Sequence, residues 1–142
     1  MKLAYAHAYR QNSVQTASPG HLILMLFDGA LRFMTRALEG FEQTEVIPRN
    51  EAVHVNLIKT QAIIDELQTS LNLEAGGEFA RTMSALYDFM RDQLRVANIR
   101  KDSAPVQIVM KLLGDIRGTW SAMLAQTENQ ASTPAAWVAT AA

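Results

Sequence analysis

Glu51 and His54 form the pair in this sequence that comes closest to a catalytic centre. Three residues apart on a helix, a carboxylate and an imidazole lie one turn apart on the same face, as the metal ligands of di-iron bundles do. Such a site needs a second pair of this kind and two more glutamates, and neither His7 nor His21 has a carboxylate three positions before it. We place Glu51 in the first turn of its helix, where an acid is favourable without a metal. The sequence predicts no metal and no cofactor.

The other acidic and nucleophilic residues give no better basis for catalysis. Two acid pairs, Asp65 with Glu66 and Asp88 with Asp92, fall on helix surfaces, and nothing in the sequence indicates the burial that separates the pKa values of catalytic carboxylates. The chain has no cysteine, no nucleophile elbow and no glycine-rich phosphate loop. We predict that the protein is not an enzyme. A metal-dependent bundle enzyme is the alternative, and metal analysis of purified protein would test it.

Charge and hydropathy exclude further classes of partner. The net charge of the 142 residues is -1, and lysine and arginine are scattered, so no basic stripe indicates nucleic-acid binding. The apolar run Leu22–Phe27 is broken by Asp28, well short of the roughly 18 residues of a membrane span, and the N-terminus lacks the apolar core of a signal peptide. We expect a cytoplasmic protein without membrane insertion.

Hydrophobic periodicity predicts four long helices. In the first, Asp28, Arg32, Thr35 and Glu39 form one narrow polar edge and the remaining surface is apolar, so this helix needs neighbours on two or three sides. Ser18-Pro19 is its start signal. The small residues at Gly114 and Gly118 favour close packing of the last helix. The predicted helices span residues 18–43, 49–72, 77–100 and 105–127.

These helices predict an all-α fold, an antiparallel up-down four-helix bundle with a short extra N-terminal element. We expect one bundle domain over residues 1–127, with an N-terminal lid segment at 1–17, followed by a flexible alanine-rich tail at 128–142.

Some apolar residues are not used by the predicted core. On the second helix Val55, Ile58 and Ala62 are rotated by more than about 90° from the core direction, and Phe89 and Val96 are similarly displaced on the third. They either pack against flanking helices and the terminal segments or line grooves for a segment of another protein.

Two stretches of the chain carry a family likeness. Residues 9–31, from Tyr9 to Leu31, closely resemble the N-terminal signature of the flagellin export chaperones, the FliS family. Residues 43–58 and the chain after residue 128 match no pattern of the family. The second group of matching residues is Gly76-Gly77-Glu78, Leu86-Tyr87-Asp88-Phe89-Met90, Ala97-Asn98 and Trp120.

The resemblance implies an export chaperone that binds the disordered C-terminal segment of flagellin in the cytoplasm, prevents premature polymerisation and presents flagellin to the flagellar type III secretion apparatus. It implies that the N-terminal segment occupies one groove when the client is absent, and Tyr9 matches the family's tyrosine there. An anti-sigma factor and other flagellar assembly or regulatory proteins are further partners that the resemblance admits. The alternative is a helical interaction module or regulator without a secretion client.

Overall fold

The computed structural model describes residues 18–129, and these fold into four α-helices. Residues 1–17, which include the predicted lid, and most of the predicted tail lie outside the described residues. None of the helices in the described range is long and apolar enough to span a bilayer. The helices are α2 (Pro19–Phe41), α3 (Val46–Thr69), α4 (Leu73–Arg100) and α5 (Ala104–Asn129).

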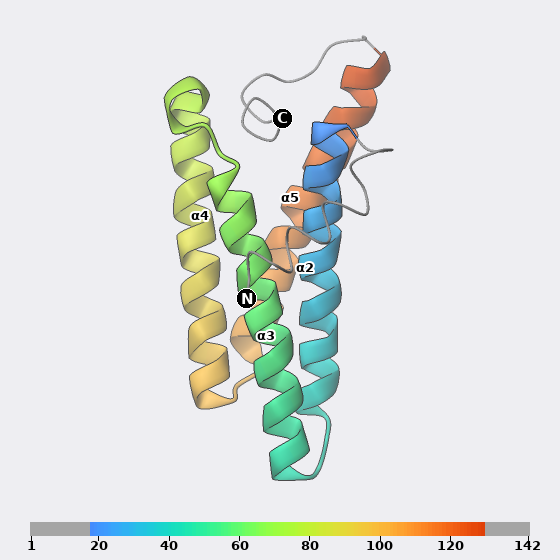
Figure 1. Ribbon diagram of the computed structural model, residues 1–142, viewed down its shortest axis with the longest axis vertical. Helices are drawn as coiled ribbons and strands as arrows, with labels where there is room; N and C mark the ends of the chain where they lie inside the picture. The colour runs from blue at the N-terminus through green and yellow to red at the C-terminus, as the bar shows by residue number, and fades with distance from the viewer. Residues whose placement is uncertain (1–17, 130–142) are drawn as a thin grey trace.

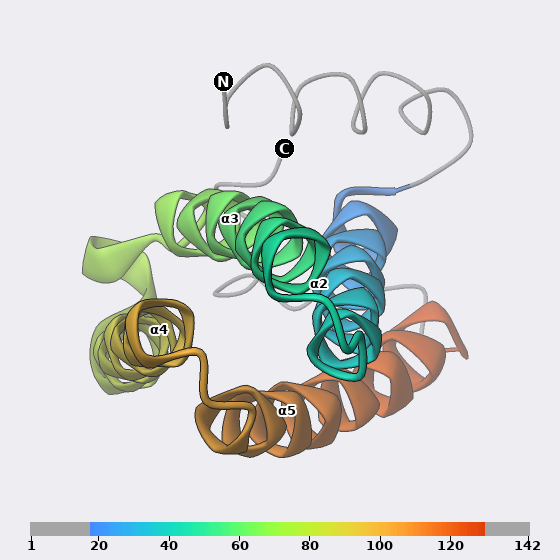
Figure 2. The same ribbon diagram turned by 90° about the horizontal axis from the view of Figure 1, so that it is seen from below.

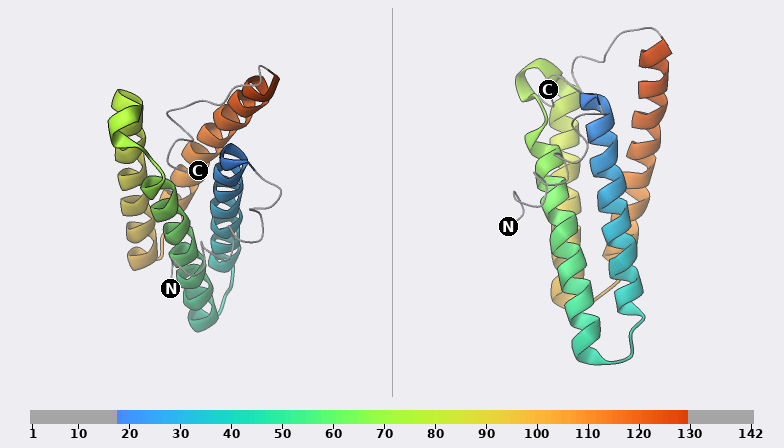
Figure 3. Two further views of the ribbon diagram at one scale, coloured as in Figure 1. Left: turned by 45° about the horizontal axis from the view of Figure 1, so that its top comes forward. Right: turned by 45° about the vertical axis from the view of Figure 1, so that its right-hand side comes forward.

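The four helices alternate in direction and form a bundle, as Figures 1 and 3 show. Each helix packs against two others, so that α2 contacts α3 and α5, while α4 contacts the same two helices from the opposite side. Seen along the bundle, α2 and α3 form one side and α4 and α5 the other (Figure 2). The predicted all-α four-helix bundle is confirmed.

Helix α2 begins and packs as its sequence predicts. The Ser18 side chain caps it by accepting a 3.3 Å hydrogen bond from the backbone N–H of His21, and Pro19 occupies the first turn, where no intrahelical partner is lost. Three members of the predicted polar edge, Arg32, Thr35 and Glu39, are exposed. Asp28, the fourth, is half-buried because Nε of Arg117 on α5 donates a 2.8 Å hydrogen bond to its carboxylate.

The boundaries of α3 differ from the prediction. The helix begins at Val46, three residues before the expected start, because Pro48 falls in its first turn, where backbone N–H groups have no helical partner to lose. The helix also ends at Thr69, three residues early. Glu51 therefore lies in the second turn rather than the first, so the argument from the helix dipole does not hold for it.

A kink divides α4 near its start. Gly77 has φ 56° and ψ -135°, a conformation that glycine adopts readily and that side chains disfavour. One helical turn, Leu73–Gly76, precedes the kink, and the long part of α4 follows it as predicted from residue 77. At the other end Lys101 adopts the left-handed conformation that closes many helices.

Contrary to our expectation, the glycines of α5 do not lie where another helix approaches closely. A Cβ atom added at Gly114 or Gly118 would meet no atom within 4 Å, whereas one at Gly40 of α2 would lie 3.1 Å from Cβ of Ala52 on α3. The close helix approach is therefore between α2 and α3. The sequence prediction was wrong because a small-residue spacing does not specify which side of the helix faces a neighbour.

One apolar core joins all four helices. Its largest fully buried side chains include Trp120 of α5, Phe27 and Met34 of α2, and Met90 and Leu94 of α4. Several other apolar residues are only partly buried against it. They are Leu24, Leu31, Leu38, Phe41, Leu71, Phe79, Leu86, Met110, Leu112, Ile116 and Met123.

Candidate protein-binding surfaces

The outward face of α3 carries two exposed apolar side chains, as the sequence predicts. Val55 and Ile58 each expose 40% of their surface. Ala62, one and two turns further along the same side of the helix, is buried, with 5% exposed. Val55 and Ile58 are therefore the accessible part of this surface, which we call the α3 face.

Contacts on both flanks of α3 fix the direction of this face. On one flank Gln61 and Gln68 donate side-chain hydrogen bonds to α4, at the carbonyl oxygen of Arg91 and at Ser84. On the other flank Lys59 lies 5.3 Å from the ring centroid of Phe33 on α2. Val55 and Ile58 lie between the two flanks, so neighbouring helices of the bundle cannot cover them fully.

The second predicted surface lies on α4. Phe89 exposes 44% of its surface and Val96 is partly buried. Both are rotated away from Arg91 and Asn98, which contact α3 through Asp65 and His54. Helical rotation therefore turns Phe89 and Val96 toward the side of α4 that adjoins α5.

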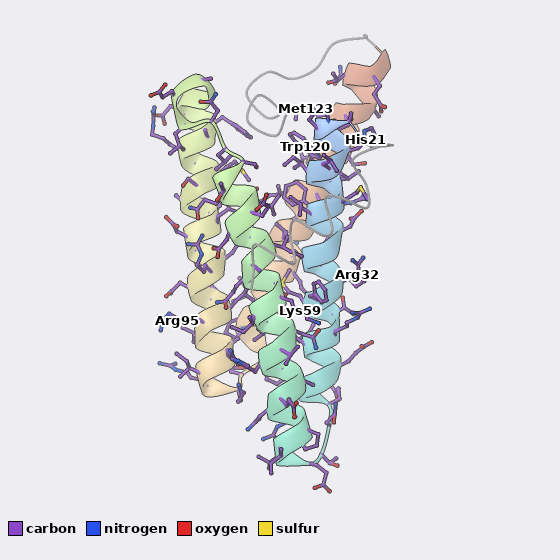
Figure 4. The ribbon with its side chains drawn as sticks, viewed as in Figure 1. His21, Arg32, Lys59, Arg95, Trp120 and Met123 are labelled. Atoms are coloured by element: carbon purple, nitrogen blue, oxygen red, sulfur yellow. The ribbon has the colours of Figure 1, made fainter. Side chains whose placement is uncertain are left out.

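Four partly buried apolar residues lie on the same side of the bundle as Phe89 and Val96. Leu86 of α4 and three residues of α5 pack against the core with one side and remain partly exposed on the other. On α5 they lie on the flank opposite Arg117, which faces α2, and Met123 is visible near Trp120 in Figure 4. The three residues of α5 are Leu112, Ile116 and Met123. Together with Phe89, Val96 and Leu86 they line the side of the bundle where α4 adjoins α5, and we call this set of residues the α4–α5 groove.

A signal for these residues was present in the sequence. Apolar residues of the fourth helix form a stripe that is wider than one buried face, and Leu112, Ile116 and Met123 all lie along one edge of that stripe. Residues at such an edge are the ones that a four-helix core covers incompletely.

The two surfaces are separate. The α3 face lies on the side of the bundle formed by α2 and α3, and the α4–α5 groove lies on the opposite side (Figure 2). The structure thus groups the predicted residues Val55, Ile58 and Ala62, and groups Phe89 with Val96, but does not bring the two sets together. The predicted contact residue Tyr9 lies outside the described residues.

The interior of the bundle formed by residues 18–129 contains a small cavity. A cavity of about 20 Å³ lies where α2 begins, α3 ends and α4 begins. That volume holds about one water molecule. Its lining is formed by Ile23, Phe27, Leu67, Ser70, Leu71, Phe79, Met83 and Tyr87.

Glu51 and His54, the pair that came closest to a metal site in the sequence, form no such site within the described residues. His54 Nδ1 lies 2.9 Å from Nδ2 of Asn98, and Glu51 is exposed. Within residues 18–129 no three side chains of histidine, aspartate or glutamate gather as a metal site requires.

Asp88 belongs to a polar seam between α3 and α4. Gln68 Nε2 donates a 2.9 Å hydrogen bond to Asp88 Oδ1, and Arg91 Nη1 donates one of 3.0 Å to the same oxygen. These hydrogen bonds, with that of Gln68 first, hold the pKa of Asp88 below its ordinary value. Arg91 also donates a 2.9 Å hydrogen bond to Asp65 and one to Gln68. The seam joins α3 to α4 through polar side chains.

Comparison with known proteins agrees with the resemblance seen in the sequence. Residues 1–127 match the family model of the flagellar protein FliS. The chain is 42% identical to the flagellar secretion chaperone FliS of Bacillus subtilis (strain 168), over 80% of each chain. It is also 42% identical to the protein of that name from Salmonella typhimurium, over 82% of this chain and 84% of the relative. The Campylobacter jejuni protein of that name is 35% identical, over 83% and 88%.

The expectation of a chaperone that is not an enzyme is confirmed by these relatives. The chain belongs to the FliS family of flagellar secretion chaperones.

Proposed function

We propose that this protein binds the disordered C-terminal segment of flagellin in the cytoplasm, prevents its premature polymerisation and delivers it to the flagellar type III secretion apparatus. The observation that carries the proposal is the apolar surface that the bundle leaves open on two opposite sides. Ile58 and Val55 provide it on the α3 face, and Phe89 provides it in the α4–α5 groove.

Two shallow surfaces suit a client that folds only when it binds. Ordering such a segment costs about 2–5 kcal/mol or more, so its apolar residues must be covered along much of its length. One small cavity of about 20 Å³ could not provide that contact. Surfaces on opposite sides of the bundle would be reached together by a segment that wraps around it, with short helices lying in apolar grooves.

A titration tests the proposed function. A peptide of the last 40 or so residues of the cognate flagellin is titrated into the full chain. Binding is followed by the heat of each injection or by the fluorescence anisotropy of the labelled peptide. We expect saturable one-to-one binding, and we expect flagellin that lacks this segment not to bind. A segment that fails to bind, or a truncated flagellin that binds equally well, would contradict the proposal.

The same titration separates the alternative function. A regulator or interaction module without a secretion client shares the fold but would show no affinity for flagellin. Delay of flagellin polymerisation provides a second readout: an equimolar amount of the chaperone should suppress filament growth from flagellin seeds.

A further inference from the structure

Three cationic side chains gather around one aromatic ring at the seam between α2 and α3. The charged groups of Arg32, Arg36 and Lys59 lie 5.8, 5.5 and 5.3 Å from the ring centroid of Phe33. Figure 4 shows Arg32 on α2 and Lys59 on α3. We call these three residues the basic cluster.

The basic cluster makes no ion pair within the described part of the chain, although Glu39 lies one helical turn beyond Arg36 on α2. Asp28, one turn before Arg32, pairs with Arg117 on α5 instead. Of the six other arginines in residues 18–129, four have a carboxylate partner, namely Arg81, Arg91, Arg95 and Arg117, whereas Arg49 and Arg100 have none.

The ends of the chain cannot supply the missing side-chain charge. Residues 1–17 contain Lys2 and Arg10 but no aspartate or glutamate, and residues 130–142 contain no charged side chain. These two segments therefore offer no side-chain carboxylate to the basic cluster.

Holding the three cations together is unfavourable in the free protein. Each lies within 6 Å of one centroid, so their separations are comparable with the Debye length of about 8 Å at physiological ionic strength, and salt screens their repulsion only partly. The ring beneath them is buried, with 4% exposed, which weakens screening further. Attraction to the face of Phe33 offsets part of this repulsion, and an incoming carboxylate would remove more of it.

The basic cluster adjoins the α3 face. Lys59 follows Ile58 directly and lies one turn from Val55, and its side chain reaches across to α2. Apolar and cationic residues thus form one continuous surface, with Arg32 and Arg36 one helical turn apart along its edge.

We propose that the part of the client that lies on the α3 face is an acidic, amphipathic segment whose carboxylates bind the basic cluster. This inference rests on the proposed function and adds the chemistry of the client. Apolar side chains of the segment cover Val55 and Ile58, and carboxylates one helical turn apart pair with Arg32 and Arg36. An anionic membrane is the less suitable occupant, because lipid-binding clusters contain about four to eight basic residues.

The test is the salt dependence of flagellin binding. The last 40 or so residues of the cognate flagellin are titrated at 50 and 500 mM NaCl against the wild-type chain and an Arg32→Gln/Arg36→Gln variant. We expect the wild-type affinity to fall about tenfold between these salt concentrations, and the variant to bind about tenfold more weakly at 50 mM with little dependence on salt.

Two controls make the result specific. Arg81→Gln/Arg95→Gln changes the net charge equally but removes arginines that are paired on α4, and it should bind like the wild type. A flagellin segment with its aspartates and glutamates replaced by asparagine and glutamine should bind the wild type as weakly as the natural segment binds the Arg32→Gln/Arg36→Gln variant.

Several outcomes would overturn the inference while leaving the proposed function intact. The natural segment could bind the wild type and both variants equally, or the loss of affinity could be the same in both variants. The Arg32→Gln/Arg36→Gln substitution could instead alter only self-association, or only binding to vesicles that contain phosphatidylserine. If flagellin does not bind the wild type at all, the proposed function itself fails.

Discussion

Trp120 Nε1 donates a 2.8 Å hydrogen bond to the backbone carbonyl oxygen of Gly20. The indole is fully buried, and its hydrogen bond joins the C-terminal half of α5 to the first turn of α2. An indole needs such a partner when it is buried, because an unpaired N–H in the core is costly. This contact therefore joins α2 and α5, the first and last described helices, at one end of the bundle.

Replacing Trp120 with phenylalanine should lower the free energy of unfolding by about 2–3 kcal/mol. The substitution removes buried aromatic volume and leaves the carbonyl of Gly20 without its partner. Urea denaturation followed by circular dichroism measures the change. Thr119→Ala, at the exposed neighbouring position, is the control and should change stability by less than about 0.5 kcal/mol. Equal stability of the Trp120→Phe variant and the wild type would contradict the role of this contact.

The glycines of the bundle should respond in opposite directions to substitution. Gly114→Ala should raise the free energy of unfolding by about 0.5–1 kcal/mol, because the added methyl group meets no atom and alanine favours the helix. Gly40→Val should lower it by more than about 1 kcal/mol, because the space beside Ala52 is already filled. Thermal denaturation of the two variants gives both signs. A stable Gly40→Val protein would mean that α2 and α3 are not in close contact there.

The polar seam predicts a dependence of stability on pH. The pKa of Asp88 is below its ordinary value of 3.8 in the folded protein, so its contribution to stability is complete above that value and is lost as the pH falls through the folded pKa. The difference in unfolding free energy between the wild type and Asp88→Asn should therefore shrink in strong acid.

A titration followed by NMR checks the cause of this shift. Carboxyl resonances give the pKa of Asp88 directly. A Gln68→Met variant lacks the hydrogen bond that lowers the pKa of Asp88 most. In this variant the pKa of Asp88 should therefore move up toward its ordinary value. A pKa of Asp88 that is the same in the wild type and in this variant would contradict the assignment.

The sequence allowed the fold to be predicted well because the local signals were strong. Ser18-Pro19 marks the start of α2, and the nearly continuous apolar surface of that helix required packing on several sides. Helix ends were less predictable. Pro48 indicated a break in the pattern, yet a proline in the first turn loses no hydrogen bond, so α3 begins before it.

The candidate surfaces were predictable only in part. Helical rotation correctly placed Val55, Ile58 and Phe89 on exposed surfaces, because that property depends on one helix alone. The burial of Ala62 and the exposed edge of Ile116 depend on packing between elements, which periodicity does not specify. The basic cluster was missed for the same reason, since Lys59 meets Arg32 and Arg36 only across two helices.

The proposed role of the N-terminal segment predicts competition with the client. If the segment that holds Tyr9 covers a binding surface in the free protein, deleting residues 1–12 removes the competitor and should leave the affinity for flagellin unchanged or raise it by up to about tenfold. Calorimetric titration of the truncated chain measures this. Tyr9→Ala in the full chain is the companion variant and should act in the same direction. A large loss of affinity would mean that Tyr9 contacts the client directly.

The central claim is that the α3 face and the α4–α5 groove bind flagellin. The most direct measurement is the affinity of the flagellin C-terminal segment for Ile58→Asp, Phe89→Asp and the matched control Ile99→Asp. Ile99 exposes 70% of its surface and lies on the side of α4 that faces away from the core, so its substitution adds the same charge elsewhere. We predict that Ile58→Asp and Phe89→Asp weaken binding about tenfold or more, with the helical content unchanged, and that Ile99→Asp does not. Unchanged affinity in both Ile58→Asp and Phe89→Asp, with the fold intact, would contradict the account.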